Sequence, residues 1–379
     1  MIRLAAPDLD ENDLAAVCDV LRTGYIVQGR QVLAFEARMV ELTGAAHAVA
    51  VSNCTAALHL ALLALDIGPG DLVAVTSYSW PATANVIALC GAVPVFVDID
   101  PRTFNMEPGA LERAMRSSSR IKAVLPVHAF GGIAAMPEIR AIAVRHGVPV
   151  LEDAACALGA VLDGRPAGMW GDVGCFSFHP RKIVTTGEGG VIVTQSAEVA
   201  TRARALRNHG QDPGATKPDF VLPGFNYRLT EFQAALGLAQ LGKLPLLLAC
   251  HRRLARRYDE WFANSAILPP IALEEASHTY QSYVVLLPTS SAEQRDGVIA
   301  LLKERGIETS IGTYHLPLTT YWRQAQGCKV GDYPVTDDVA ARALALPLHT
   351  SLSEEDQGRV VEELESSVRQ VVSVGVGRG

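Results

Sequence analysis

The sequence predicts an α/β protein, in which a mostly parallel sheet covered by helices is followed by a smaller α+β part. From about residue 47, short apolar runs alternate with polar or glycine-rich residues and helical stretches, as in a parallel sheet. Most runs are valine-rich and lack polar alternation, so we expect helices on both faces of the sheet. The seven predicted strands cover residues 47–52, 72–77, 93–99, 122–128, 148–153, 174–178 and 190–194.

The pattern changes after the last of these strands. From residue 229 it is helical, until Pro245 interrupts it, because proline lacks the amide proton and clashes with the preceding turn. We therefore place the domain change there, with a large domain at 1–245 and a small domain at 246–379. The small domain is predicted to contain a strand at 282–288, helices at 294–306 and 353–370, and a loosely held tail at 372–379.

Composition excludes several classes of protein. The chain has 379 residues, 49% hydrophobic, and a formal net charge of −7, so nucleic acid is not an expected partner. Its seven cysteines include no CxxC pair, which favours the cytoplasm over a disulfide framework. The start is too acidic for a signal peptide, and no apolar run approaches the roughly 20 residues that span a membrane. No motif indicates a metal site.

Polar residues follow the strands, where ligands of open α/β sheets bind. Lys182 lies in a loop after the strand at 174–178, where an amine with a lowered pKa could form a Schiff base; Arg181 could contribute to lowering it. The alternative is an exposed loop lysine. Asp153 ends an apolar strand, where a carboxylate needs a partner such as a protonated ring nitrogen. Its alternative role is a helix N-cap.

The segment VSNCTAALHLALLAL reads as a strand, a polar turn and a buried helix whose N-terminus could bind phosphate. Thr55 could add its hydroxyl to the backbone amides of Cys54 and Ala56, although simple helix capping also explains the polar turn. Ser177 is a further candidate phosphate donor. Trp80 could lie flat on a pyridine ring, or pack in the core. Together these residues match the phosphate, nitrogen, ring face and aldehyde carbon of one cofactor.

With these motifs the sequence resembles the DegT/DnrJ/EryC1/StrS family, the fold-type I sugar aminotransferases that use pyridoxal 5'-phosphate. The resemblance is strong from about residue 24 to 258 and weaker to residue 350. The stretches that carry it are QGRQVLAFE (28–36), SNCTAAL (52–58), GPGD (68–71), PVFVDID (94–100), PVHAFG (126–131), LEDAACALGA (151–160), FSFHPRKIVTTGEGG (176–190), LRNHG (206–210) and GFNYRLTEFQAALGLAQL (224–241).

The resemblance implies a role for each candidate. Lys182 would form the internal aldimine and move the proton, and Asp153 would pair with the pyridinium nitrogen. The phosphate would be held by Thr55, Ser177 and the amides around Cys54 and Ala56, and Trp80 would stack on the ring. The resemblance also implies a homodimer with shared active sites, because the asparagine that corresponds to Asn226 reaches the neighbouring subunit's phosphate.

Two residues depart from the family's pattern. The family usually has glycine at the position of Cys54, so the phosphate turn must accept a side chain; backbone donation survives if φ stays negative. Cys156 replaces the usual glutamine or histidine, which weakens or removes a polar contact to the cofactor's ring hydroxyl. We therefore expect Cys156 beside the cofactor, with its role left open.

The resemblance implies ping-pong transfer of an amino group, from L-glutamate, to a nucleotide-linked 3- or 4-keto-6-deoxy sugar. Tyr25, Tyr314 and His315 are the candidate substrate residues, and a structural role for His315 is the alternative. Keto cyclitols and aromatic amino acid precursors are alternative acceptors in the family. The rival functions are a sugar dehydratase on the same scaffold and a non-catalytic binding protein. Lys182 and the missing cysteine cluster argue against the first, and Lys182, Asp153 and Thr55 together argue against the second.

Overall fold

The structure is a computed structural model that describes residues 1–376. Its centre is a layer of seven strands, made of a four-stranded sheet in the order β1-β10-β9-β6 and a three-stranded sheet in the order β4-β2-β5. Parallel bridges from Val124 to Val150 and from Val127 to Asp153 join the two sheets. Only β10 runs antiparallel to its neighbours. These strands are β1 (His47–Val51), β2 (Leu72–Thr76), β4 (Val93–Val97), β5 (Ile121–Leu125), β6 (Leu151–Asp153), β9 (Val173–Ser177) and β10 (Gly190–Thr194).

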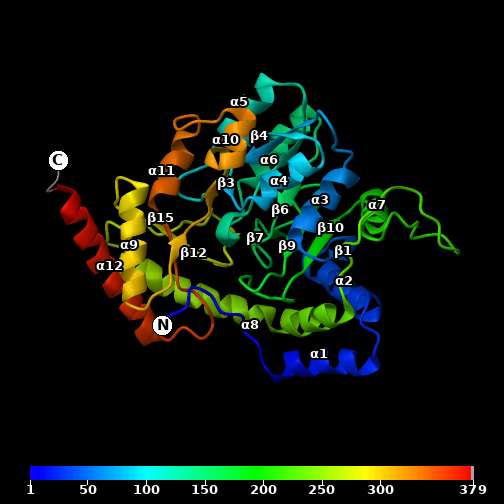
Figure 1. The fold of residues 1–379 in the computed structure, drawn as a ribbon, viewed down its shortest axis with the longest axis horizontal. Coiled ribbons are helices and arrows are strands. Elements are labelled where there is room, and N and C mark those ends of the chain that lie inside the picture. Colours follow the sequence, from blue (N-terminus) through cyan, green and yellow to red (C-terminus); the bar gives the residue numbers. More distant parts are fainter. Residues whose placement is uncertain (377–379) are drawn as a thin grey trace.

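Helices cover both faces of this layer, as the valine-rich strands predicted (Figure 1). Side chains of a strand alternate between faces, and in β1 Ala48 and Ala50 belong to one core whereas Val49 and Val51 belong to another. The first core takes its helical residues mainly from α2 (Arg30–Thr43), α5 (Pro108–Ser117), α6 (Met136–His146) and α8 (Glu231–Phe262). The second core takes them from α3 (Cys54–Ala64), α4 (Ala82–Leu89) and α7 (Ala197–Arg207).

The prediction that Pro245 interrupts the helix is wrong, because α8 continues through it for 32 residues. Pro245 lies on the exposed side of the helix, where water can bond the carbonyl group that a proline leaves without a donor. On the other side, Leu244 and Leu247 are buried in the first core. Packing of this buried side outweighs the local cost of the proline. The proposed domain boundary at 245 therefore falls inside a continuous helix.

Replacing Pro245 with alanine is expected to raise the free energy of unfolding by about 1–3 kcal/mol, because alanine restores the amide donor and removes the ring clash. Leu246, which is 75% exposed, gives the control variant Leu246→Ala, expected to change stability by less than about 0.5 kcal/mol. Chemical denaturation measures both. A less stable Pro245→Ala variant would show that the fold depends on a bend at this position.

The C-terminal part is α+β, with a third core of its own. Its sheet has the antiparallel order β12-β15-β13, and the predicted strand at 282–288 and helices at 294–306 and 353–370 are confirmed. The last helix extends to Val376, so 372–376 is helical; the remainder of the predicted tail, 377–379, lies outside the described residues. The elements are β12 (Tyr283–Leu286), α9 (Ala292–Glu304), β13 (Ser310–Ile311), α10 (Thr320–Gln326), α11 (Pro334–Arg342), β15 (Ala343–Leu346) and α12 (Glu354–Val376).

The chain crosses between these parts more than once. Helix α1 (Glu11–Thr23) packs along α8, which runs beneath the sheet and its helices to the C-terminal part (Figure 1). Ile2 pairs with Ile307 and belongs to the third core. The short elements are β3 (Tyr78–Ser79), η1 (Ala129–Gly131), β7 (Val161–Leu162), β8 (Arg165–Pro166), β11 (Ala276–Ser277), β14 (Tyr314–His315) and η2 (Leu316–Leu318).

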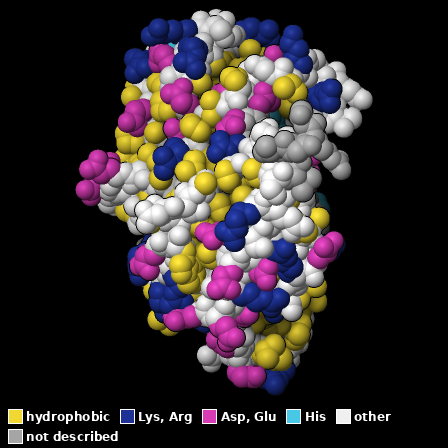
Figure 2. Space-filling model, turned by 90° about the vertical axis from the view of Figure 1, so that its left-hand side faces the viewer, with side chains coloured by type: hydrophobic (Ala, Val, Ile, Leu, Met, Phe, Trp, Pro, Cys, Tyr) yellow, Lys and Arg dark blue, Asp and Glu magenta, His cyan; other side chains and the backbone are white. Residues whose placement is uncertain are grey.

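Helix α8 is, within residues 1–376, the one helix long and apolar enough to cross a membrane by length and composition alone, with a mean hydropathy of 1.3 in its most apolar stretch of 18 residues. The expectation that no apolar run reaches this length is therefore wrong. Leu241, Leu244 and Leu247 of this helix are core residues, and a core helix passes the same test. On the face shown in Figure 2, basic and acidic side chains are interspersed, so this face carries no continuous basic surface for nucleic acid.

Candidate active site

The ends of β1 and β9 and the start of β10 lie beside the start of α3. Val51 pairs with Gly190, and Gly190 pairs in turn with Ser177 on the next strand. A Cβ atom on Gly190 would lie 2.4 Å from the backbone oxygen of Asn53, so only glycine lets β10 approach this turn so closely. This pairing places Ser177 at the same sheet edge as the first turn of α3.

The first turn of α3 offers free backbone donors. Asn53 caps the helix, its side-chain oxygen accepting from the amide of Ala56 at 2.8 Å. The amides of Cys54 and Thr55 donate to no other group in residues 1–376, and the Thr55 side chain is exposed. Burial raises the pKa of the Cys54 thiol well above its usual value, so this side chain adds no negative charge. The turn therefore suits an anion, although the Ala56 amide is already engaged.

Asp153 is the last residue of β6 and only 4% exposed. Its Oδ2 accepts from the Thr83 hydroxyl at 2.8 Å and its Oδ1 from the Ala155 amide at 3.2 Å. No helix begins after Asp153, so the N-cap alternative is wrong. Burial raises the pKa of this carboxyl, against the opposing effect of both hydrogen bonds. Within residues 1–376, no basic side chain lies within 4.0 Å of the Asp153 carboxylate. This carboxylate can therefore pair with a cation bound at the site.

Sequence reasoning missed Thr83, which lies in the first turn of α4. Thr83 donates its only hydroxyl proton to Asp153, so Ser79, whose Oγ is 2.9 Å from the Thr83 Oγ1, donates to Thr83. The two residues hold the carboxylate in one orientation. The spacing of four between Ser79 and Thr83 was visible in the sequence, but nothing in it indicated that their target was Asp153.

A second pair missed by sequence reasoning lies behind Asp153. His128 is fully buried; its Nε2 is 2.7 Å from a Glu152 oxygen, and its Nδ1 accepts from the Ala134 amide. This arrangement puts the ring proton on Nε2, where it is donated to Glu152. The backbone amide of His128 donates to the Asp153 carbonyl at 3.0 Å. The pair thus fixes the strand tip that carries Asp153.

Lys182 lies in the loop after β9, half-buried, and its Nζ is 3.1 Å from the Cys156 Sγ. The expected lowering of its pKa is wrong. Burial does act to lower the pKa of Lys182, but Cys156 and Asp153 together favour the charged amine and the net pKa is raised. Arg181 is exposed and is not among the groups that shift it. Lys182, Cys156, Cys54 and Asp153 therefore share one electrostatic environment.

Trp80, Tyr314 and His315 lie together because β14 pairs with β3, with Tyr314 opposite Ser79. The Trp80 indole is 60% exposed and contacts the edge of the Tyr314 ring at a centroid distance of 5.4 Å. The alternative of core packing for Trp80 is therefore wrong. The His315 Nε2 is 2.9 Å from Asp337, and burial lowers the His315 pKa, so the ring is neutral at neutral pH. His315 therefore makes a hydrogen bond to Asp337 that fits the alternative of a structural role.

Two candidates stand apart from this cluster within a single chain. Tyr25 is 60% exposed and lies over Gly29, beside the start of α8. Asn226 is exposed and forms an isolated bridge with Asn208. No hydrogen bond joins either side chain to Lys182 or Asp153 in the described residues.

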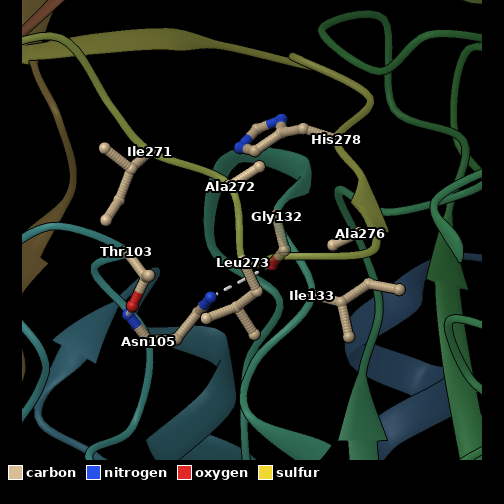
Figure 3. A pocket seen from close by; sticks show the side chains of 9 residues that line it. All are labelled: Thr103, Asn105, Gly132, Ile133, Ile271, Ala272, Leu273, Ala276 and His278. Atoms are coloured by element: carbon tan, nitrogen blue, oxygen red, sulfur yellow. Dashed lines mark hydrogen bonds between the residues drawn. The ribbon is translucent and has the colours of Figure 1, made fainter. Parts of the chain in front are cut away.

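A separate pocket lies between the loop after β4 and the segment before β11 (Figure 3). Asn105 points to the Gly132 carbonyl oxygen there and donates to it, beneath Leu273 and Ile271. The pocket has no room for a water molecule, and none of its lining residues is a candidate site residue. Burial lowers the pKa of its His278 to about 3, so this ring is uncharged. This pocket is a packing gap rather than the site.

The buried carboxylate, the lysine and the open amides of α3 meet the needs of a pyridoxal-phosphate enzyme with an α/β fold. Comparison with known proteins agrees. Residues 7–365 match the DegT/DnrJ/EryC1/StrS aminotransferase family, and the chain belongs to this family. GDP-perosamine synthase of Caulobacter vibrioides is 39% identical over 368 residues, which are 96% of this chain and 97% of that protein.

Solved structures extend the likeness. Spr1654 from Streptococcus pneumoniae, solved in PLP and PMP forms, is 31% identical in the PLP form, with a TM-score of 0.92 over 97% of this chain and 98% of that chain. Helicobacter pylori PseC, an aminotransferase involved in the biosynthesis of pseudoaminic acid, has a TM-score of 0.91 at 27% identity, over 97% and 99% of the two chains. The protein is therefore a pyridoxal-phosphate-dependent sugar aminotransferase, and the predicted fold class, family, enzyme class and cofactor are confirmed.

Replacing Thr83 with valine is expected to weaken pyridoxal-phosphate binding by about 1.5–3 kcal/mol, roughly tenfold or more, because Asp153 loses a hydrogen bond of the kind made to charged groups. Thr83→Ser keeps the hydroxyl and should bind nearly as the native protein does. Titration of cofactor-free protein, followed by absorbance, measures both affinities. Equal losses in the two variants would mean that the methyl group's packing, and not the hydrogen bond, matters here.

Proposed function

We propose that this aminotransferase moves an amino group from L-glutamate to a nucleotide-linked 3- or 4-keto-6-deoxy sugar by a ping-pong mechanism. The observation that carries the proposal is the shared environment of Lys182 and Asp153 at the sheet edge beside the first turn of α3. When bound there, pyridoxal phosphate would supply an electron sink that spreads the negative charge of a deprotonated carbon.

The protein's own residues would hold the cofactor and move the proton. Lys182 would hold the cofactor covalently and, when free, would take and return the proton at the substrate carbon through its Nζ. Asp153 keeps the ring nitrogen protonated, because a cation beside a buried carboxylate without an ion pair partner is strongly favoured. Cys156, 3.1 Å from Lys182, would lie beside the cofactor.

The phosphate would bind at the first turn of α3. The open amides of Cys54 and Thr55, the Thr55 hydroxyl and Ser177 are the donors best placed for it, whereas the Ala56 amide would have to be shared with Asn53. The exposed Trp80 indole would cover one face of the ring and keep water from it.

A homodimer with shared sites belongs to this proposal. Asn226 is exposed and directly precedes Tyr227, whose carbonyl accepts from the Ser52 amide at 2.8 Å. We propose that the Asn226 side chain reaches the phosphate bound by the partner chain. Tyr25, Ile26 and Val27 are 60%, 45% and 57% exposed, an apolar run of the kind found at subunit interfaces. We place the enzyme in the cytoplasm, and propose a large domain at 1–245 and a small domain at 246–379 that share the continuous helix α8.

The acceptor sugar is proposed from the relative and the site. The 39% identical relative is named for a sugar linked to guanosine diphosphate, perosamine. Tyr314 and His315 pair with the strand that leads to Trp80, so they would face a substrate bound on the cofactor's exposed side, with Tyr25 as a further contact. Retained Lys182 favours amino transfer over dehydration.

The two half-reactions test this function. Glutamate should bleach the absorbance of the lysine-bound cofactor, and a GDP-linked 4-keto-6-deoxy sugar should restore it in a single turnover. A keto cyclitol and the same keto sugar without its nucleotide serve as the comparison acceptors. Faster recovery with the cyclitol would overturn the sugar proposal, and failure of glutamate alongside success of another amino acid would overturn the donor.

A further inference from the structure

The contact between Lys182 and Cys156 stands out among the groups of the site. The Nζ to Sγ distance is 3.1 Å, and this sulfur is the only acceptor of the Lys182 amine in residues 1–376. Both backbones are held in place: the Lys182 amide donates to the His179 carbonyl at 2.8 Å, and the Cys156 carbonyl accepts from the Thr279 hydroxyl at 3.0 Å. The two side chains therefore start from held backbone positions, with their reactive atoms 3.1 Å apart.

The other cysteines lack this combination of access and partner. All seven are unpaired. Cys54 and Cys175 are buried, and burial raises the pKa of both thiols, which keeps them protonated and unreactive. Cys18 is exposed on α1 with no lysine amine within hydrogen-bonding distance, whereas Cys156 is half-buried and so open to small molecules.

We propose that Cys156 is an oxidation site that reversibly locks Lys182 through a sulfur–nitrogen bond whenever the amine is not occupied by the cofactor. The required oxidant is a peroxide such as hydrogen peroxide. The effect on catalysis rests on the proposed function, in which Lys182 binds pyridoxal phosphate. Formation of the bond itself does not, because it needs only the two side chains and the oxidant.

The chemistry balances in two steps. The Cys156 sulfur attacks hydrogen peroxide, so that an S–O bond forms and the O–O bond breaks, giving a sulfenic acid and water; sulfur is oxidised and peroxide is reduced. The charged Lys182 amine first gives one proton to water, and the neutral amine then attacks that sulfur, forming an S–N bond as the S–O bond breaks. The hydroxyl group leaves as water with one proton of the amine. Two molecules of an external thiol reverse the bond, restoring the thiol and the amine and leaving one disulfide.

The lock depends on the state of the enzyme. A cofactor attached to Lys182 occupies the amine and protects it. The cofactor-loaded protein should therefore resist formation of the sulfur–nitrogen bond. The cofactor-free protein, and the form in which the cofactor carries the substrate's amino group, leave Lys182 free beside Cys156. Peroxide should therefore stop these forms from recovering the lysine-bound cofactor.

The test treats cofactor-free and cofactor-loaded protein with hydrogen peroxide and maps the products by mass spectrometry. In cofactor-free native protein we expect a peptide that joins residues 156 and 182 with the loss of two hydrogen atoms. Binding of added pyridoxal phosphate should fail, and dithiothreitol should restore it. Cys156→Ser should form no such link and keep its cofactor binding after peroxide, whereas Cys18→Ser should behave as the native protein does.

Some outcomes would overturn the proposal. Addition of oxygen to Cys156 without a link to Lys182 would do so, as would loss of cofactor binding after peroxide in Cys156→Ser. An equal yield of the link in cofactor-loaded and cofactor-free protein would leave the bond standing but contradict the proposed role of Lys182. The mass map thus separates failure of this inference from failure of the proposed function.

Discussion

Replacing Lys182 with alanine is expected to lower kcat by about 10⁴-fold or more, because one side chain supplies both the covalent link to the cofactor and the proton transfer. The variant should also lack the absorbance of the lysine-bound cofactor. Its fold should be unaffected, since Lys182 is half-buried and its amine hydrogen-bonds only to Cys156 within residues 1–376. Single-turnover kinetics with glutamate measure the first effect, and an absorbance spectrum the second.

The control for this variant is the neighbouring residue. Arg181 is exposed, and its carbonyl, which a substitution keeps, accepts from the Gln281 side chain. Arg181→Ala should therefore retain the absorbance and most of the turnover. Full transaminase turnover in Lys182→Ala would contradict the assignment of the cofactor lysine.

Replacing Asp153 with asparagine is expected to weaken cofactor binding by about 2–5 kcal/mol, roughly 30-fold or more, because a protonated ring nitrogen would lose its buried charged partner. The half-reaction with glutamate should slow as well, since an unprotonated ring is a poorer electron sink. Cofactor titration and single-turnover kinetics measure the two effects. Unchanged cofactor affinity and half-reaction rate would show that Asp153 does not face the ring nitrogen.

The same substitution should act in the opposite direction on the cofactor-free protein. Burial raises the pKa of Asp153, so the folded protein binds this proton more tightly than the unfolded chain, and ionisation at neutral pH destabilises the fold. Asp153→Asn removes that penalty, and Thr83 can accept from the new amide while donating to Ser79. Cofactor-free Asp153→Asn should unfold at a higher temperature at neutral pH. The difference should vanish below the ordinary carboxyl pKa, where Asp153 is protonated in both states.

The sequence predicted much of this architecture because its signals are local. Apolar runs, most of them valine-rich, predicted all seven strands of the central layer, and the residues at or after their ends supplied the candidates Lys182 and Asp153. Local reasoning failed where a distant contact decided the outcome. Pro245 reads as a helix end in the sequence, but burial of the opposite side of α8 keeps the helix continuous.

By itself, the sequence determined the order of strands and helices, the family and the residue types available for the cofactor. Only the tertiary structure decided which of them meet: Thr83 with Asp153, Tyr314 with Trp80, and Cys156 with Lys182. These contacts join residues that are 70, 234 and 26 positions apart in the sequence. Local sequence patterns cannot predict contacts over such separations. The raised pKa of Lys182 also depends on the tertiary structure. Burial alone would lower this pKa, whereas neighbours distant in the chain raise it.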